Sequence, residues 1–185
     1  MLRPPVEPML AQAVESVPTL RDLAFEQKFE DGRRALLFTP AEAGGRVLLQ
    51  TRRGSLVQDR FPDLVAAAEQ LPVGLVLDGE LLVWDAEAGQ LSFAGLQRRA
   101  AARRRTAPGL AARWPAHFVA FHVLMADGVE LLALAYRERR RRLEVLFAAQ
   151  ALTPRGHCAR RPRTWRRRGS GWSRGPTYPA SKAWS

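Results

Sequence analysis

The chain has 185 residues, of which 46% are hydrophobic and 25% charged, with a formal net charge of +11. This composition is typical of about one soluble globular domain, and it excludes fibrous and wholly disordered proteins. A disulfide-stapled protein is also excluded, because the single cysteine, Cys158, has no partner in the chain. No apolar run is long enough for a signal peptide or a membrane span, so we expect a cytoplasmic protein with no membrane partner.

The first part of the chain predicts a small antiparallel meander. Residues 4–23 carry scattered prolines and a short amphipathic stretch over 9–17, which we expect to lead into the first strand. Alternating apolar and polar residues predict strands over 25–29, 34–39 and 46–51, with a turn at Ala43-Gly44-Gly45 between the last two.

The remaining elements mix helices with strands. Helical spacing predicts a helix over 61–71, in which Pro62 and Asp63 suit the first turn, and further helices over 94–113 and 136–150. Apolar runs predict strands over 75–84, 91–93 and 117–124. Because the strands come in runs, we expect an α+β fold of mainly antiparallel sheets with packed helices.

The end of the chain differs from the rest in composition. Residues 154–185 hold nine basic residues, no acid and no Val, Leu, Ile or Met, whereas residues 1–153 have 20 basic and 18 acidic residues. We therefore expect a folded unit over 1–153 and a basic, disordered tail over 154–185. The tail is either a natural nucleic-acid-binding segment or a frameshift product. The second is favoured because the chain has 27 arginines, two lysines and no Ile or Asn, which suggests a GC-rich gene.

Lys28 is the only lysine in the first 153 residues, in a chain that otherwise uses arginine for positive charge. A lysine amine can lose its proton and act as a nucleophile, whereas a guanidinium stays protonated. Asp78 and Glu80 stand two apart in the apolar run 75–84, so they share one face of a strand. Two buried carboxylates are costly unless they are paired or bind a ligand, which favours a functional role.

These residues form an ordered set of four motifs. They are Lys28-Phe29-Glu30-Asp31-Gly32-Arg33-Arg34, Thr51-Arg52-Arg53-Gly54, Leu77-Asp78-Gly79-Glu80-Leu81, and Phe118-Val119-Ala120-Phe121-His122-Val123-Leu124. The set resembles the nucleotidyltransferase signature of ATP-dependent DNA ligases, in which the lysine of Lys-x-Asp-Gly-x-Arg becomes adenylylated. The resemblance covers roughly residues 4–152 and implies the N-terminal part of an adenylylation domain.

The resemblance implies a role for each matching residue. Lys28 would attack the α-phosphorus of ATP and expel pyrophosphate, with Mg²⁺ offsetting the charge on the phosphate oxygens. Arg34 and Arg52 would contact the sugar or the phosphates. Glu80 would meet the ribose hydroxyls or a metal-bound water. Taken alone, Arg34 and Arg52 could equally be the solvated ends of a hairpin.

Two further residues would recognise the base, namely Phe121, which would stack on adenine, and Glu26, which would help to read the base edge. As a lone strand residue, Phe121 would more often belong to the core. In the family, AMP then passes to a 5′-phosphate of nicked double-stranded DNA, and attack by a 3′-hydroxyl seals the nick in repair and recombination. We expect such a protein to act as a monomer.

The chain departs from the family pattern at three points. Phe29 and Glu30 both separate Lys28 from Asp31, where the signature has one residue, so we expect a bulge there. His122 stands where the family has aspartate, and is expected to be a core histidine rather than a ligand. Beyond Leu152 the lysine-bearing strands and the OB-fold domain of the family do not follow, and each lost charge-stabilising donor commonly costs a hundredfold or more in rate.

These observations lead to one main hypothesis and two alternatives. The main one is a ligase adenylylation domain truncated by a frameshift near Thr153 and impaired as it stands. The second is a non-catalytic remnant that binds nucleic acid through the tail and Arg103-Arg104-Arg105. The third is an RNA ligase or an mRNA capping enzyme, since these share the lysine signature.

Overall fold

The computed structural model describes residues 1–10, 12–15, 31–150, 167–168 and 171–172. Its strands are β1 (Arg33–Phe38), β2 (Leu48–Thr51), β3 (Val76–Asp85), β4 (Gln90–Leu91), β5 (Ala116–Ala126), β6 (Val129–Glu130), β7 (Arg167–Arg168) and β8 (Gly171–Trp172). Its helices are the short 3₁₀ helix η1 (Gln58–Arg60) and the α-helices α1 (Pro62–Ala68), α2 (Phe93–Ala100), α3 (Ala107–Arg113) and α4 (Tyr136–Ala149).

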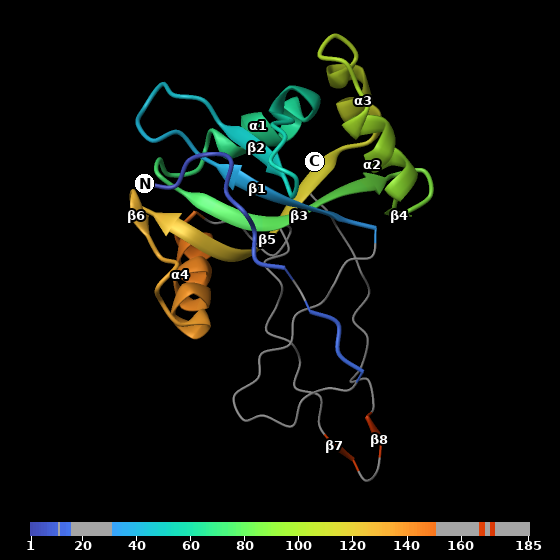
Figure 1. The fold of residues 1–185 in the computed structure, drawn as a ribbon. Helices are drawn as coiled ribbons and strands as arrows, with labels where there is room; N and C mark the ends of the chain where they lie inside the picture. Colours follow the sequence, from blue (N-terminus) through green and yellow to red (C-terminus); the bar gives the residue numbers. More distant parts are fainter. Residues whose placement is uncertain (11, 16–30, 151–166, 169–170, 173–185) are drawn as a thin grey trace.

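One antiparallel sheet organises the described part of the chain (Figure 1). Its strands follow the order β2-β1-β3-β5-β6, and β4 pairs with the far end of β3. The expected mixture of antiparallel sheet and helices is confirmed. Two short strands, β7 and β8, pair with each other within the segment expected to be a basic tail.

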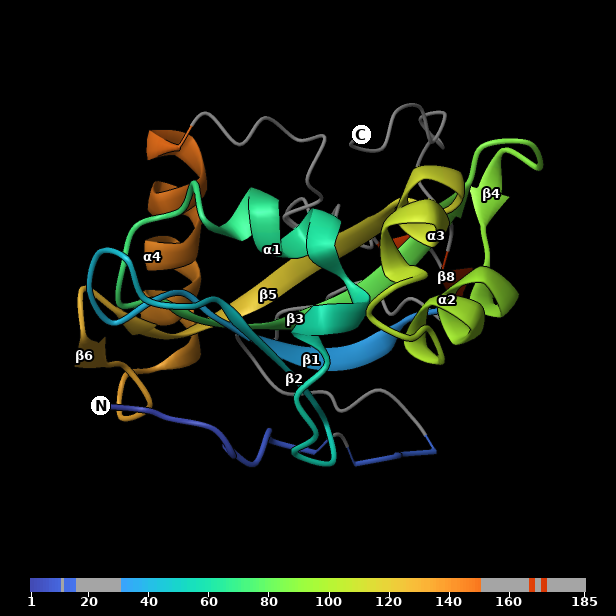
Figure 2. The same ribbon diagram turned by 90° about the horizontal axis from the view of Figure 1, so that it is seen from above.

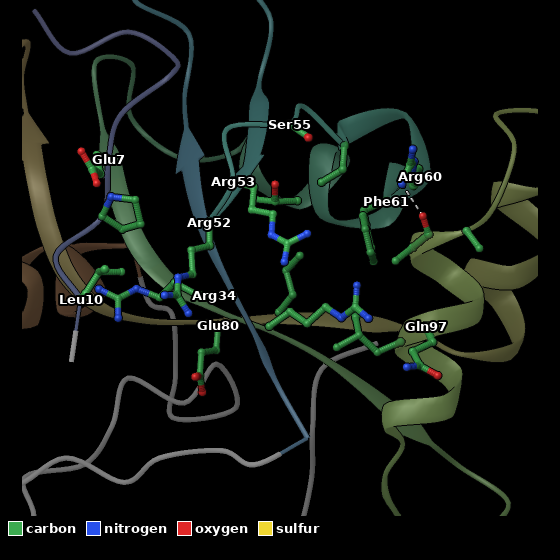
Figure 3. A pocket seen from close by; sticks show the side chains of 18 residues that line it. Glu7, Leu10, Arg34, Arg52, Arg53, Ser55, Arg60, Phe61, Glu80 and Gln97 are labelled. Carbon is green, nitrogen blue, oxygen red and sulfur yellow. Dashed lines mark hydrogen bonds between the residues drawn. The ribbon is translucent and has the colours of Figure 1, made fainter. Parts of the chain in front are cut away.

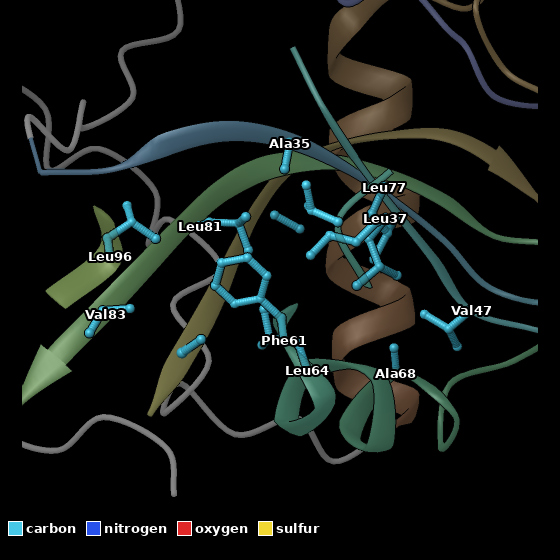
Figure 4. Packing of buried hydrophobic residues seen from close by; sticks show 14 of the residues in the cluster. Ala35, Leu37, Val47, Phe61, Leu64, Ala68, Leu77, Leu81, Val83 and Leu96 are labelled. Atoms are coloured by element: carbon cyan, nitrogen blue, oxygen red, sulfur yellow. The ribbon is translucent and has the colours of Figure 1, made fainter. Parts of the chain in front are cut away.

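The main hydrophobic core lies between the sheet and the helices. Ala35 and Leu37 of β1 and Leu77 and Leu81 of β3 belong to one buried cluster with residues of α1, α2 and α4 (Figure 4). Phe61, at the start of α1, is 1% exposed, and burying such a side chain contributes about 1.5–3 kcal/mol. Figures 1 and 2 show α2 and α3 at one end of the sheet and α4 at the other.

The opposite face of the sheet is partly covered by the N-terminal residues. Leu36 and Phe38 of β1 alternate with the core residues and pack in a second cluster, against which Leu2 and Val6 lie. The fully buried Gln50 of β2 holds this segment, because its amide accepts a hydrogen bond from the Val6 N–H (2.9 Å) and donates one to the Val6 carbonyl (2.6 Å). The described residues of this segment are neither helix nor strand.

The single helix predicted over 94–113 is wrong, because the structure has two helices, α2 and α3, separated by residues 101–106. Pro108 lies in the first turn of α3, where its missing N–H costs nothing. Inside a continuous helix its ring would clash with the carbonyl four residues earlier. The other expected elements that the structure describes are present with shifted ends. In the described residues no helix has the length and apolarity needed to cross a membrane.

Candidate functional site

The best-defined polar feature on the second face of the sheet is an ion pair between β1 and β3. Arg34 donates from Nε to Asp78 Oδ1 and from Nη2 to Asp78 Oδ2, both at 2.6 Å. The Asp78 side chain is 2% exposed and that of Arg34 is 23% exposed. Such a two-bonded pair is strong and directional, and it leaves three of the five Arg34 N–H groups for other partners.

The Arg34 guanidinium also covers an aromatic ring. Its central carbon lies 4.6 Å from the centre of the Phe121 ring. Phe121 occupies a break in the β3–β5 register, since Asp78 pairs with His122 while Gly79 pairs with Ala120. The extra residue in β5 makes a bulge, which re-aims a side chain that regular alternation would place otherwise.

His122 behaves as a core residue. It is 8% exposed, and its ring meets those of Phe121 and Tyr136 edge-on at 5.3 and 5.5 Å between centres. Its Nδ1 lies 3.8 Å from Asp78 Oδ2, the carboxylate oxygen that also accepts from Arg34 Nη2. This placement agrees with the expectation of a core histidine.

Glu80 lies beside the end of the first motif. It is the register partner of Arg34, and Asp78 and Glu80 project from the same face of β3, as expected. A Cβ atom on Gly32 would lie 3.1 Å from Glu80 Oε2, so the glycine backbone packs directly against this carboxylate. The fold thus brings the Asp-Gly end of the first motif to the Asp-Gly-Glu motif of β3.

Gly79, between the two acids, is required by close packing rather than by its backbone angles. A Cβ there would overlap the carbonyl oxygen of Val119 and lie 2.7 Å from Phe118 Cζ. Only glycine therefore lets β5 approach β3 at this point. This approach is what puts the β5 bulge, and Phe121 with it, beside Asp78.

A tight turn after β2 supplies two more arginines. The N–H of Gly54 donates to the Thr51 carbonyl at 2.9 Å, and Gly54 has a φ of +86°, which favours glycine. The turn leaves the side chains of Arg52 and Arg53 exposed. Within the described part of the chain neither arginine forms an ion pair, so both can meet an anion.

These elements surround an open cavity of about 1140 Å³ (Figure 3). Its basic lining consists of Arg33, Arg34, Arg52, Arg53 and Arg60, and its acidic lining of Glu7 and Glu80. The other walls come from the N-terminal segment and from α2. The excess of arginines makes the cavity suited to an anionic ligand.

One buried ion pair supports the far wall of this cavity. Arg99 of α2 is fully buried and donates to both carboxylate oxygens of Asp63, at 2.9 and 2.5 Å, to the Trp114 carbonyl and to the Arg60 carbonyl. Burial raises the pKa of Asp63, but the bonds from Arg99 and from the Ala116 N–H outweigh it and hold the pKa below its ordinary value. The hydrogen bonds of Arg99 and Asp63 thus hold α1, α2 and the start of β5 together.

The cavity brings together only some of the residues singled out from the sequence. Arg34, Arg52 and Glu80 line it, whereas Phe121 is not among its lining residues and lies against Arg34 instead. Lys28 and Glu26 lie outside the described residues, as does the bulge expected between Lys28 and Asp31.

Other residues of the cavity wall were not anticipated. Arg60 and Gln97 line the cavity although neither belongs to a recognised motif. They come from η1 and α2, which the fold alone places beside the β2 turn. Arg53 could have been suspected from its place next to Arg52.

The described residues offer little to a metal on their own. No group of three or more His, Cys, Asp or Glu side chains among them could hold a metal ion. Mg²⁺ commonly binds through one or two carboxylates together with phosphates of the substrate. Glu80, in the wall of an arginine-lined cavity, fits that type of site.

Comparison with known proteins identifies the family. The family model described as "ATP dependent DNA ligase domain" matches residues 8–162. The chain belongs to the ATP-dependent DNA ligase family. The match reaches beyond the expected domain boundary at residue 153.

Several DNA ligases are similar to this chain. DNA ligase C1 of Mycolicibacterium smegmatis is 37% identical over 146 residues, which are 77% of this chain and 41% of that protein. DNA ligase C of Mycobacterium tuberculosis is 36% identical over 74% of this chain and 36% of its own length. The probable DNA ligase of Opitutus terrae is 36% identical, and 13% of it is covered. This ligase-family chain therefore spans less than half of these relatives.

Solved structures agree with the sequence comparison. A mycobacterial DNA ligase D complexed with ATP and MES matches with a TM-score of 0.52 at 35% identity, over 66% of this chain and 36% of that one. The ligase domain of M. tuberculosis LigD matches with a TM-score of 0.51, also at 35% identity, over 68% of this chain and 36% of its own. The fold is thus that of part of a ligase domain.

Proposed function

We propose that this chain carries part of the adenylylation site of an ATP-dependent DNA ligase and that Lys28 is its nucleophile. The observation that carries the proposal is the arrangement of Arg34, Asp78 and Glu80 on one face of the sheet, at the wall of an arginine-lined cavity. Gly32, four residues after Lys28, packs against Glu80. This contact supports a place for Lys28 near the same site.

The proposed reaction exchanges one bond for another at the α-phosphorus of ATP. The Lys28 amine, after losing a proton, forms a nitrogen–phosphorus bond, and the bond to the leaving pyrophosphate breaks. Arg52, exposed at the β2 turn, and the N–H groups of Arg34 that Asp78 does not bond would neutralise phosphate oxygens. Because Asp78 fixes Arg34 with two bonds, these donors are oriented before the nucleotide binds.

Glu80, Phe121 and Glu26 are proposed to hold the nucleoside. Glu80 would accept hydrogen bonds from the ribose hydroxyls, Glu26 would read the base edge, and Phe121 would stack on adenine. Since Arg34 already covers the Phe121 ring, the base must use the other face or displace the guanidinium. Mg²⁺, held by Glu80 and the phosphates, would supply charge neutralisation at the phosphate oxygens.

The later steps are proposed from the family. AMP passes from the lysine to a 5′-phosphate of nicked double-stranded DNA, and the 3′-hydroxyl displaces it to seal the nick. Relatives include multifunctional non-homologous end joining DNA repair protein LigD of M. tuberculosis, 39% identical over 132 residues. DNA repair is accordingly the proposed role. The chain is further proposed to act in the cytoplasm as a monomer.

The test is intact-mass analysis of the purified full chain after incubation with ATP and Mg²⁺. We expect one covalent adenylyl group on the wild type and none on Lys28→Ala. The chain has a single other lysine, Lys182, so Lys182→Ala is a matched control that should keep the adduct. An adduct that survives Lys28→Ala, or no adduct on a wild type shown to be folded by circular dichroism, would refute the proposal.

A further inference from the structure

The arginine-lined cavity extends well past the residues assigned to the nucleotide. Arg34, Arg52 and Glu80 lie together at one side, Arg60 and Gln97 lie at the other side with η1 and α2, and the Arg53 side chain lies between them (Figure 3). The cavity, of about 1140 Å³, is open to solvent, and Arg60 and Gln97 in its wall have no role assigned toward the nucleotide. The α2 side is therefore where a second part of the substrate would lie.

At its α2 side the cavity joins an exposed basic loop. The Arg60 guanidinium donates a hydrogen bond to the carbonyl of Ala100, which is the last residue of α2. Ala100 and Ala101 both line the cavity. Arg103 follows three residues after Ala100, so its Cα lies at most about 11 Å away. The Arg103 carbonyl accepts from the N–H groups of Thr106 (2.9 Å) and Ala107 (3.1 Å), which holds the loop in a turn.

The charge of this loop is not offset by the described residues around it. Arg103, Arg104 and Arg105 are all exposed, and none forms an ion pair with the described part of the chain. Between Glu87 and Asp127 the sequence contains no acidic residue. A run of arginines without acids, close to an arginine-lined cavity, is suited to a chain of phosphates rather than to one phosphate group.

We propose that Arg53 and Arg103–Arg105 form a track that binds successive backbone phosphates of the DNA strand entering the cavity. The inference rests on the proposed function for the identity of the nucleic acid. It adds the place on this chain where the duplex lies, namely over the β2 turn and the α2–α3 loop. Arg60 acts as a positioning residue, because its bond to Ala100 holds the end of α2, from which the α2–α3 loop starts, against η1.

The experiment measures binding of a fluorescein-labelled nicked DNA duplex to the full chain across a salt series, without ATP. Substituting glutamine at all three residues Arg103–Arg105 should lower the slope of log K against log salt by about 2 to 3, since each phosphate contact contributes about 0.9. Arg53→Gln alone should lower it by about 1. The control has the same charge loss on exposed arginines remote from the α2–α3 loop: Arg46→Gln, Arg137→Gln and Arg141→Gln. This triple control variant should change the slope by less than about 0.5 relative to the wild type.

Equal losses in the track and control variants would overturn the proposal, because binding would then follow total charge. An unchanged slope in the track variant would overturn it as well. Lysine at all three positions Arg103–Arg105 keeps the charge and should retain the slope, which separates phosphate binding from a folding defect. Since no ATP is present, failure of lysine adenylylation would leave this result unaffected, so the two proposals fail separately.

Discussion

The ion pair between Arg34 and Asp78 gives a quantitative test of the site. Removing either partner leaves the other charge without its two hydrogen bonds, and breaking a buried pair in this way costs about 3–5 kcal/mol. The two variants should differ. After Asp78→Ala, Arg34 can turn toward water because it is already 23% exposed, whereas after Arg34→Ala the Asp78 carboxylate stays buried at 2% exposure.

We therefore expect Asp78→Ala to lower the free energy of unfolding by about 3 kcal/mol and Arg34→Ala by about 4 kcal/mol. The double variant should cost about 2 kcal/mol less than the two single costs added together, because hydrogen bonds to charged groups contribute about 1.5–3 kcal/mol. Two other charged or titratable groups of the described residues lie near this pair, His122 beside Asp78 and Glu80 opposite Arg34, and both stay in place in all three variants.

The assay is equilibrium unfolding in urea, followed by circular dichroism, for the wild type and the three variants. The matched control is the ion pair between Glu138 Oε1 and Arg142 Nε, which lie 3.6 Å apart. Their side chains are 44% and 47% exposed. Its coupling should stay below about 0.5 kcal/mol, as for other exposed pairs. Costs for Arg34 and Asp78 that add within about 0.5 kcal/mol would show that the pair does not act as a unit and would refute the reasoning.

Two further predictions concern the frame around the site. Because the pKa of Asp63 is lowered in the folded state, its pairing with Arg99 stabilises the fold above about pH 4 and is lost as the pH falls through the folded pKa. In an acid titration, the free energy of unfolding of Asp63→Asn should thus fall less steeply below about pH 5 than that of the wild type. The same slope in both proteins would contradict this. Gly79→Ala should cost about 3 kcal/mol in urea unfolding, because the new Cβ would lie 2.7 Å from Phe118 Cζ. A loss under about 1 kcal/mol would mean that β5 can move away from β3.

Much of the fold could be predicted from local patterns. The strands around Leu36 and Leu81 and the helix around Leu143 were expected within a few residues, because alternation and helical spacing record which side chains face the core. The order of the four motifs was enough to suggest the family. The break between α2 and α3 was missed because an apolar and arginine-rich stretch looks helical until the effect of Pro108 is considered.

The composition and motif order, which are properties of the chain alone, determined the α+β class, the ligase resemblance and the candidate nucleophile Lys28. Only the tertiary structure decided that Arg34 pairs with Asp78, that a bulge sets Phe121 beside them, and that Arg60 reaches Ala100. These contacts depend on strand register and on the packing of η1 against α2. A shift of one residue in register would turn each side chain to the other face of the sheet, and nothing in the local sequence records that choice.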